Sequence, residues 1–171
     1  SIKSPLGKWS ERILQKRNYK YINRYTECWV PDETGPVNLA GDLSHPVQIP
    51  VTTTRYIGAL SRFTKTNGAE RKDHLLIMLS GPEPQRTIFE DKIIEQVSRY
   101  HGTATIVRGL PGNRSLIPST NMLQFYNHLP AADLSNEIIQ AEYVIGRSGY
   151  STVMDLAALE KKSILVPTPG Q

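Results

Sequence analysis

Hydrophobic residues in the second half of this chain alternate between two spacings. Residues 75–79 form a continuous apolar run, as expected of a strand that is covered on both faces. A stripe of apolar residues at helical spacing follows: Phe89, Ile93, Val97 and Tyr100. Gly102 is placed to end this helix as a C-cap glycine, and the β-branched run 103–107 predicts a second strand. The pattern indicates a strand, a helix and a parallel strand.

The same alternation continues along the rest of the chain. Further strands are predicted at 122–126, 143–145 and 163–166, and further helices at 134–140 and 152–159. Strands that alternate with helices form right-handed βαβ units, so we predict an α/β fold in which helices cover both faces of a parallel sheet. The segments after strands are longer and richer in Gly, Pro, Ser and Arg than the links from helix to strand. This asymmetry predicts a ligand site at the carboxyl ends of the strands.

The first part of the chain has a different organisation. Short strands are predicted at 26–30 and 55–59. The intervening residues 33–53 are rich in Gly, Pro and polar side chains, and so long a loop is uncommon unless it connects domains or serves a function. We therefore divide the chain into residues 1–54, the end of a preceding domain with its linker, and residues 55–171, the α/β domain.

Composition limits the class of protein. The chain has 171 residues, 39% of them hydrophobic, a net charge of +4 and one cysteine, Cys28. No stretch approaches the ~18 apolar residues of a membrane-spanning helix, and a single cysteine forms no internal disulfide. The first residues lack a secretory signal and an initiator Met. We expect a cytoplasmic protein and a fragment of a longer chain.

The positive charge is concentrated at the start of the sequence. Residues 1–24 hold seven lysines and arginines and one glutamate, a net charge of +6, so the remainder of the chain sums to −2. Leu6, Trp9 and Ile13 recur at helical spacing within this segment and predict a helix over 5–23. Two interpretations stay open: a solvated helix face that a partner domain covers, or attraction to anionic lipid headgroups or a polyphosphate. No recognition motif accompanies the charge, so we expect no nucleic acid partner.

The most specific candidate site follows the fourth predicted strand. Gly146 and Gly149 would let the backbone turn sharply and approach a ligand closely. Ser151 or Thr152 would then open a helix whose unpaired N–H groups favour an anion such as phosphate. The carboxylate of Asp155 would accept hydrogen bonds from a ribose diol. A plain helix start is equally compatible, since Thr152 and Asp155 have the spacing of a capping box.

Other loops at the same strand ends carry weaker signals. After the first strand, the backbone at Gly81 would cradle a phosphate and Arg86 would clamp it. However, Pro82 and Pro84 lack N–H donors, so an ordinary strand-to-helix turn explains this segment as well. Tyr126 follows the third strand and would line a base pocket. The sequence has no metal signature, no Walker lysine motif and no G-x-G-x-x-G, which argues against kinases, ATPases and ordinary NAD enzymes. We expect no metal and no bound cofactor.

The glycine turn and the helix after it resemble the C-terminal domain of GT-B glycosyltransferases, in particular glycosyltransferase family 28, which includes peptidoglycan N-acetylglucosaminyl transferases. The family pattern of Ser-Gly-x-x-Thr, an acidic residue, an Ala-rich helix and a strand ending in Val-Pro matches residues 148–158 and 166–167. Three further segments show looser similarity. Residues 75–86 resemble the phosphate loop of the family, and residues 124–129 resemble the segment whose backbone contacts uracil. Residues 58–62 resemble a Gly-x-x-x-Arg element near the interdomain cleft.

This resemblance implies a Rossmann-like domain that binds a nucleoside diphosphate sugar, expected to be UDP-linked, as the donor for an unknown acceptor. The implied nucleotide-sugar site comprises residues that follow four of the five predicted strands: Gly81, Arg86, Tyr126, Leu129, Gly149, Ser151, Thr152, Asp155 and Gln171. Arg62 would face the interdomain cleft. The sequence departs from the family in its acid, Asp155 instead of Glu, and in the two prolines of the phosphate loop.

The full-length protein would then be a glycosyltransferase whose other domain supplies the general base, and the present chain alone would be inactive. Contact of the basic segment 1–24 with the inner face of a membrane is an additional expectation. Two alternatives remain. One is an enzyme similar to UDP-N-acetylglucosamine 2-epimerases, which share the donor-binding architecture, and the other is a nucleotide- or partner-binding domain without activity.

Overall fold

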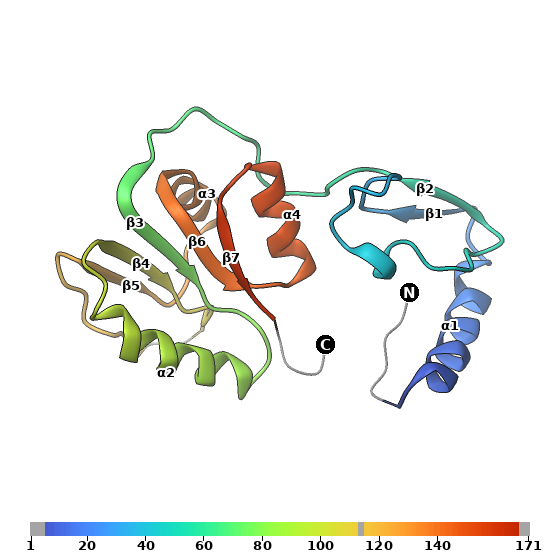
Figure 1. Ribbon diagram of the computed structural model, residues 1–171, viewed down its shortest axis with the longest axis horizontal. Helices are drawn as coiled ribbons and strands as arrows, with labels where there is room; N and C mark the ends of the chain where they lie inside the picture. The colour runs from blue at the N-terminus through green and yellow to red at the C-terminus, as the bar shows by residue number, and fades with distance from the viewer. Residues whose placement is uncertain (1–5, 113–114, 168–171) are drawn as a thin grey trace. The chain divides into compact units, whose positions relative to one another are not determined.

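The computed structural model describes residues 6–112 and 115–167, and the chain forms two compact units (Figure 1). The first unit extends to Arg62 and the second begins at Phe63. The expected boundary after residue 54 falls inside strand β2 (Thr53–Tyr56), which pairs in parallel with β1 (Glu27–Val30). The polar loop that suggested the boundary therefore connects two strands of one unit, and the division lies eight residues later. The assignment of the first unit to the end of an acceptor-side domain stays a prediction.

The loop between β1 and β2 is organised around one buried carboxylate. Asp32 is fully buried, and its oxygens accept hydrogen bonds from the Leu39 N–H at 2.8 Å, the Ala40 N–H at 3.1 Å and the Ser44 hydroxyl at 2.5 Å. A short 3-10 helix, η1 (Gly41–Leu43), lies between these donors. Burial by itself opposes ionisation, but the hydrogen bonds outweigh it and hold the pKa of Asp32 at about 2.

The predicted first helix is confirmed as α1 (Lys8–Ile22). It begins directly after Gly7, whose φ of 86° is not helical, and only Ser10 along its length is buried. The side chain of Tyr19 donates a hydrogen bond to the carbonyl of Gln48, which ties α1 to the loop before β2. Most of the helix surface, including Trp9 at 76% exposure, is accessible within this unit.

The second unit contains the predicted alternation of strands and helices. Its strands are β3 (Arg71–Met78), β4 (Thr103–Val107), β5 (Leu123–Tyr126), β6 (Ala141–Arg147) and β7 (Ser163–Val166). Its helices are α2 (Gln85–Val97), α3 (Ala131–Gln140) and α4 (Tyr150–Ala158). All neighbouring strands are parallel, in the order β5-β4-β3-β6-β7. This confirms the α/β class, and the order of three strands wound one way and two the other is that of a Rossmann-like sheet.

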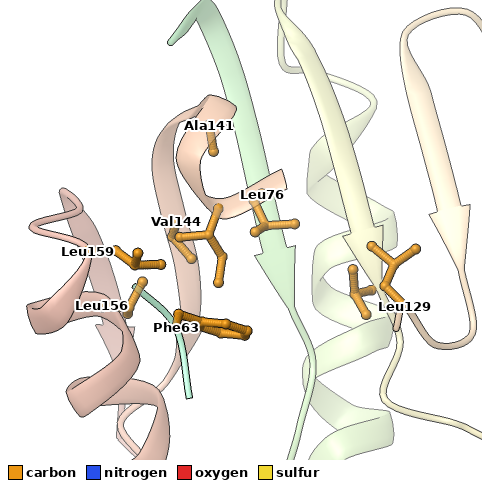
Figure 2. Close-up of a cluster of buried hydrophobic side chains, with 9 residues drawn as sticks. Phe63, Leu76, Leu129, Ala141, Val144, Leu156 and Leu159 are labelled. Carbon is orange, nitrogen blue, oxygen red and sulfur yellow. The ribbon is translucent and has the colours of Figure 1, made fainter. Parts of the chain in front are cut away.

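Helices cover both faces of the sheet (Figure 1). Successive residues of each strand point alternately to the two faces, so each strand packs against helices on both sides. Leu76 of β3 and Val144 of β6 pack with Leu156 of α4 and Ile138 of α3, and Figure 2 shows the first three converging. On the other face, the apolar stripe of α2 packs on β3 and β4 through Phe89, Val97, Ile77 and Ile106. The continuous apolar runs in the sequence therefore reflect strands buried on both sides.

Two local predictions are wrong. The helix α2 ends with Ser98 as its C-cap, so Gly102 does not cap it. A Cβ at Gly102 would lie 2.1 Å from the carbonyl oxygen of Asp73, so this glycine is required by close backbone packing. The other error concerns β6, which follows α3 without any linker. Within the described ranges, no helix has the length and apolar character needed to cross a bilayer.

Candidate functional site

The winding direction of the sheet reverses between β3 and β6. The chain leaves β3 towards α2 on one face and leaves β6 towards α4 on the other, and the two strands are neighbours with Met78 opposite Gly146. Ligands of open α/β sheets bind at this point, outside the carboxyl ends of the strands. The structure therefore brings the two predicted phosphate loops together, one with Gly81 and one with Gly149.

Helix α4 begins at this point without a side-chain cap. Its N-cap is Gly149, in extended conformation with φ −67° and ψ 143°, and Tyr150 is the first helical residue. Thr152 and Asp155 thus lie inside the helix, and their interpretation as a capping box is wrong. Because glycine offers no oxygen to the first turn and Ser151 is exposed, this turn is suited to an anion.

Neither glycine of this turn adopts the left-handed conformation. A Cβ at Gly149 would have only the Thr152 hydroxyl nearby, at 3.9 Å, and one at Gly146 would lie in ordinary contact with the carbonyl of Met78 at 3.5 Å. The expectation that these glycines permit a sharp turn is therefore not supported by the backbone. The consequence of Gly149 is open space at the start of α4, which a ligand would be able to enter.

The loop after β3 is less suited to an anion. Gly81 adopts φ 111°, which favours glycine, and it borders open space. However, the N–H groups at the start of α2 already have partners. The Thr87 N–H donates to the carboxylate of Glu83 at 3.2 Å, and the Arg86 N–H donates to the Pro82 carbonyl at 3.1 Å. Of the two helix starts, α4 is the better candidate for binding phosphate.

The side chain of Arg86 is buried in a network of ion pairs. Its Nε lies 2.6 Å from a Glu83 oxygen and its Nη1 lies 3.0 Å from a Glu90 oxygen. Arg108, which follows β4, pairs with the same Glu90. Burial alone would raise the pKa of Glu90, but hydrogen bonds from the two arginines outweigh it and lower that pKa. A phosphate would have to displace a carboxylate from Arg86, so the role of Arg86 as a clamp stays a prediction that this geometry disfavours.

Arg147 is a feature of the site that sequence reasoning did not single out. It ends β6, and its side chain is only 6% exposed. Its guanidinium donates to the carbonyls of Gln85 and Pro167, each at 2.8 Å, and lies 4.8 Å from the ring centre of Phe89. Within residues 6–112 and 115–167, the buried Nε has no hydrogen-bond partner. The available signal was an arginine at the end of a strand, directly before the Ser148-Gly149 turn.

The predicted ribose and base contacts lie on different elements, one on a helix and one at the end of a strand. Asp155 is in the second turn of α4 and is 8% exposed. Tyr126 ends β5, with β4 and β3 between it and β6, and is 39% exposed. The side chain of Leu129 is buried and belongs to the same core cluster as Leu76 and Val144 (Figure 2). Leu129 therefore serves the core through its side chain, and only its backbone remains a candidate for contact with a base.

Two further predicted residues are not placed in this site. Arg62 is the last residue of the first unit, so its proposed position in an interdomain cleft stays a prediction. Gln171 lies outside the described residues. Across the described part of the chain, no group of three or more His, Cys, Asp or Glu side chains is arranged to hold a metal ion.

Comparison with known proteins identifies the C-terminal part of this unit. Residues 113–171 match the model of the glycosyltransferase family 28 C-terminal domain. The matched segment includes β6, the glycine turn, α4 and β7, and so contains Arg147 and the start of α4. The chain has no significant match among curated proteins or solved structures. The second unit is thus a Rossmann-like α/β domain, and its residues 113–171 are similar to the C-terminal domain of glycosyltransferase family 28, which supports a domain of the GT-B type.

Proposed function

We propose that the second unit binds the nucleoside diphosphate sugar donor of a glycosyltransferase, with the diphosphate at the first turn of α4. The observation that carries this proposal is the open, uncapped start of α4 at the point where the sheet reverses its winding. A helix start of this kind carries partial positive charge and unpaired N–H donors. The family match supports a sugar-nucleotide donor as the source of the anion.

Each predicted residue then has a distinct task. Gly149 leaves room for the phosphates, and Ser151 and Thr152 contribute N–H groups and hydroxyls. Asp155 accepts hydrogen bonds from the ribose, and Tyr126 lines the base, for which uracil is our proposal. Donors that are already in place stabilise the charge that develops on the departing diphosphate, which is how this domain would promote the transfer of the sugar to an acceptor.

The decisive test places a negative charge at the start of α4. Ser151→Asp should leave the folding stability unchanged or slightly raised, because a carboxylate in the first turn complements the helix dipole. The same carboxylate should repel a diphosphate and weaken binding of UDP by at least about tenfold in a calorimetric titration. Ser98→Asp is the matched control, because it changes the net charge equally at the far end of α2.

The outcomes separate the parts of this proposal. If the unmodified chain binds neither UDP nor GDP, with or without an attached sugar, the donor-binding function is wrong. If UDP binds and Ser151→Asp binds it equally well, the diphosphate does not lie at α4. Unchanged binding in Asp155→Ala would remove Asp155 from the ribose contact. Tighter binding of GDP than of UDP would overturn our choice of uracil.

We also propose that α1 contacts an anionic membrane surface. Trp9 and Ile13 of α1 and Leu6 just before the helix are exposed, and the helix carries a series of cations: Lys8, Arg12, Lys16, Arg17 and Lys20. Apolar side chains with tryptophan, flanked by lysine and arginine, are typical of helices that lie in the membrane interface. The excess of cations over the single Glu11 supports anionic lipid as the partner.

Sedimentation with lipid vesicles tests this contact. The chain should bind vesicles that contain phosphatidylglycerol and not vesicles of pure phosphatidylcholine. Trp9→Ala should weaken the binding, whereas Trp29→Ala, which removes another exposed tryptophan from β1, should not. Equal sedimentation with both kinds of vesicle, or none with either, would contradict the proposal and favour a protein surface as the partner of α1.

A further inference from the structure

The first half of β3 contains a buried histidine whose neighbours fix its protonation state. His74 is 2% exposed, its Nδ1 lies 2.7 Å from the hydroxyl of Thr103, and its Nε2 lies 2.7 Å from the Nη2 of Arg71. A guanidinium only donates hydrogen bonds, so the Nε2 of His74 is the acceptor and carries no proton. The ring is therefore neutral, and its single N–H, on Nδ1, donates to Thr103.

Two opposite charges face this ring. Arg71 comes from β3 itself and Glu137 from α3, and the Oε2 of Glu137 lies 2.9 Å from the Arg71 Nη2 and 3.5 Å from the His74 Nε2. From β4, the groups that face the ring are the hydroxyls of Thr103 and Thr105. Burial and the charge of Arg71 lower the pKa of His74, and they outweigh Glu137, which raises it.

Protonation of His74 would change the cation that Glu137 binds. An imidazolium carries an N–H on Nε2, which would face the Arg71 N–H as donor against donor and bring two positive charges together. The side chain of Arg71 is 45% exposed whereas His74 is buried, so Arg71 is the cation that is able to move into water. Glu137 would then pair with the imidazolium.

The beginning of β3 depends on side-chain contacts of this kind. Its pairing with β6 shifts register between Arg71 and Leu75, and Asp73 adopts a left-handed φ of 55° within this interval. The N–H of Asp73 donates to the side chain of Glu142 at 2.7 Å. Because the regular ladder is interrupted here, loss of the ion pair between Arg71 and Glu137 should loosen the first residues of β3 while the rest of the sheet stays folded.

We propose that His74 is a proton-operated switch near the amino end of β3. When neutral it leaves Glu137 bound to Arg71, and when protonated it takes Glu137 and releases Arg71. The switch lies at the opposite end of β3 from the candidate donor site and does not depend on the proposed function. Segment 63–70 leads directly into Arg71, so acidification would loosen the attachment of this segment to the second unit.

The direction of the pH effect follows from the lowered pKa. Between an ordinary histidine pKa of about 6.5 and the lower value in the folded protein, the unfolded chain binds the proton and the folded chain does not. The stability that the neutral ring provides is therefore complete well above pH 6.5 and is lost as the pH falls below 6.5 towards the pKa of His74 in the folded state.

Nuclear magnetic resonance of the ring nitrogens in the 171-residue chain tests the switch from pH 8 to pH 5. At pH 8, His74 should carry its proton on Nδ1. Arg71→Gln should raise its titration midpoint by at least about half a pH unit, because a repelling cation is removed, and Glu137→Gln should lower it. Lys72→Gln, which removes the same charge from the adjacent exposed position, should change it much less. A proton on Nε2 at pH 8, or shifts of the same sign in Arg71→Gln and Glu137→Gln, would overturn the proposal.

The stability of His74→Gln provides the second measurement. A glutamine is able to accept from Arg71 and donate to Thr103, as the neutral ring does, but it takes up no proton. The melting temperature of the unmodified chain should fall by about 2 °C or more between pH 7.5 and pH 5.5, and that of His74→Gln by less than half as much. His101→Gln, which removes an exposed histidine, should behave like the unmodified chain.

Hydrogen exchange locates the change. Between pH 7.5 and pH 5.5, and after correction for the intrinsic rates, the first residues of β3 should gain at least about threefold in exchange in the unmodified chain and not in His74→Gln. Equal pH dependence of melting temperature and exchange in these two proteins would overturn the proposal. If His74→Gln does not fold, the ring titrations of the unmodified chain, Arg71→Gln and Glu137→Gln decide alone.

Discussion

At the scale of single residues, glycines at the carboxyl edge of the sheet serve opposite purposes. Gly109 adopts φ 70°, and a Cβ there would lie 2.3 Å from the carbonyl oxygen of Leu79. Gly149 has neither constraint, since its φ is negative and its surroundings are open. Gly109 is therefore needed by the fold, whereas the fold gives no reason for a glycine at position 149. A ligand that enters this space would supply the reason.

Alanine substitutions at these two glycines should have different effects. Gly109→Ala should lower the free energy of unfolding by about 2 kcal/mol or more, because it adds strain and a steric clash. Gly149→Ala should leave it within about 0.5 kcal/mol but weaken UDP binding, because the new methyl group occupies the ligand space. Urea unfolding and calorimetric titration of both variants measure the two effects. A Gly149→Ala protein that binds UDP normally would show that the phosphate does not approach this backbone.

At the scale of elements, the structure depends on two buried polar centres. Asp32 organises the loop between β1 and β2, and Glu90 of α2 joins Arg86 of its own helix to Arg108 beyond β4. In both cases one carboxylate accepts hydrogen bonds from donors in different segments of the chain. Removal of either carboxylate should therefore disturb a whole element instead of one side chain.

Substitution of Asp32 should produce a pH-dependent loss of stability. Asp32→Asn should cost about 2–4 kcal/mol at neutral pH, because a carboxamide cannot accept all of the hydrogen bonds that reach the carboxylate. The pKa of Asp32 is lowered from 3.8 to about 2, so its ionic contribution is complete above pH 4 and is lost as the pH falls towards 2. The stability difference between the two proteins should shrink over that interval in urea unfolding. A difference that is constant with pH would contradict this account.

Glu90 and Glu83 offer a matched pair of substitutions in the second unit. Glu90→Gln leaves Arg86 and Arg108 buried with less negative charge and should cost about 3–5 kcal/mol. Glu83→Gln removes a half-exposed partner of Arg86 and should cost much less. Thermal or urea unfolding of the two variants provides the comparison. Equal losses would show that burial of the ion pair is not the source of its contribution.

At the scale of the whole molecule, the two units differ in how they are stabilised. Among the described residues, the buried large apolar side chains that form the core lie at or beyond Phe63, and all of them except Met154 belong to the two clusters on the faces of the five-stranded sheet. The first unit instead buries polar residues, namely Ser10, Asp32 and Ser44. Apolar burial is the main source of folding stability, so the two units should not be equally stable.

Hydrogen exchange should reveal this difference along the chain. Backbone amides in β3, β4 and β6 should exchange slowly, through unfolding of the entire second unit. Amides in β1 and β2 should exchange much faster, because few apolar contacts oppose local opening. Mass spectrometry of peptides from a deuterated sample measures both regions in one experiment. Equal protection of β1 and β6 would contradict this difference in stability.

Much of the second unit was predictable because its pattern is local. The bounds predicted for two strands, 103–107 and 163–166, agree with β4 and β7. Continuous apolar runs and stripes at helical spacing are sufficient to predict such elements, because the pattern depends only on which residues within the element are buried. The end of α2 was wrong because Gly102 resembles a cap but is needed for packing against Asp73, a contact that spacing along the chain does not encode.

The sequence by itself determined the α/β class, the parallel sheet and the edge that carries the candidate site, because these follow from hydrophobic spacing and from the composition of the loops. Only the tertiary structure decided which helix start lacks a side-chain cap and which arginines are paired with carboxylates among the described residues. Arg86 was predicted to clamp a phosphate but is paired with carboxylates, while Arg147 holds Gln85 from 62 positions away. The electrostatic state of a side chain depends on such distant neighbours, and their identity is known only once the chain has folded.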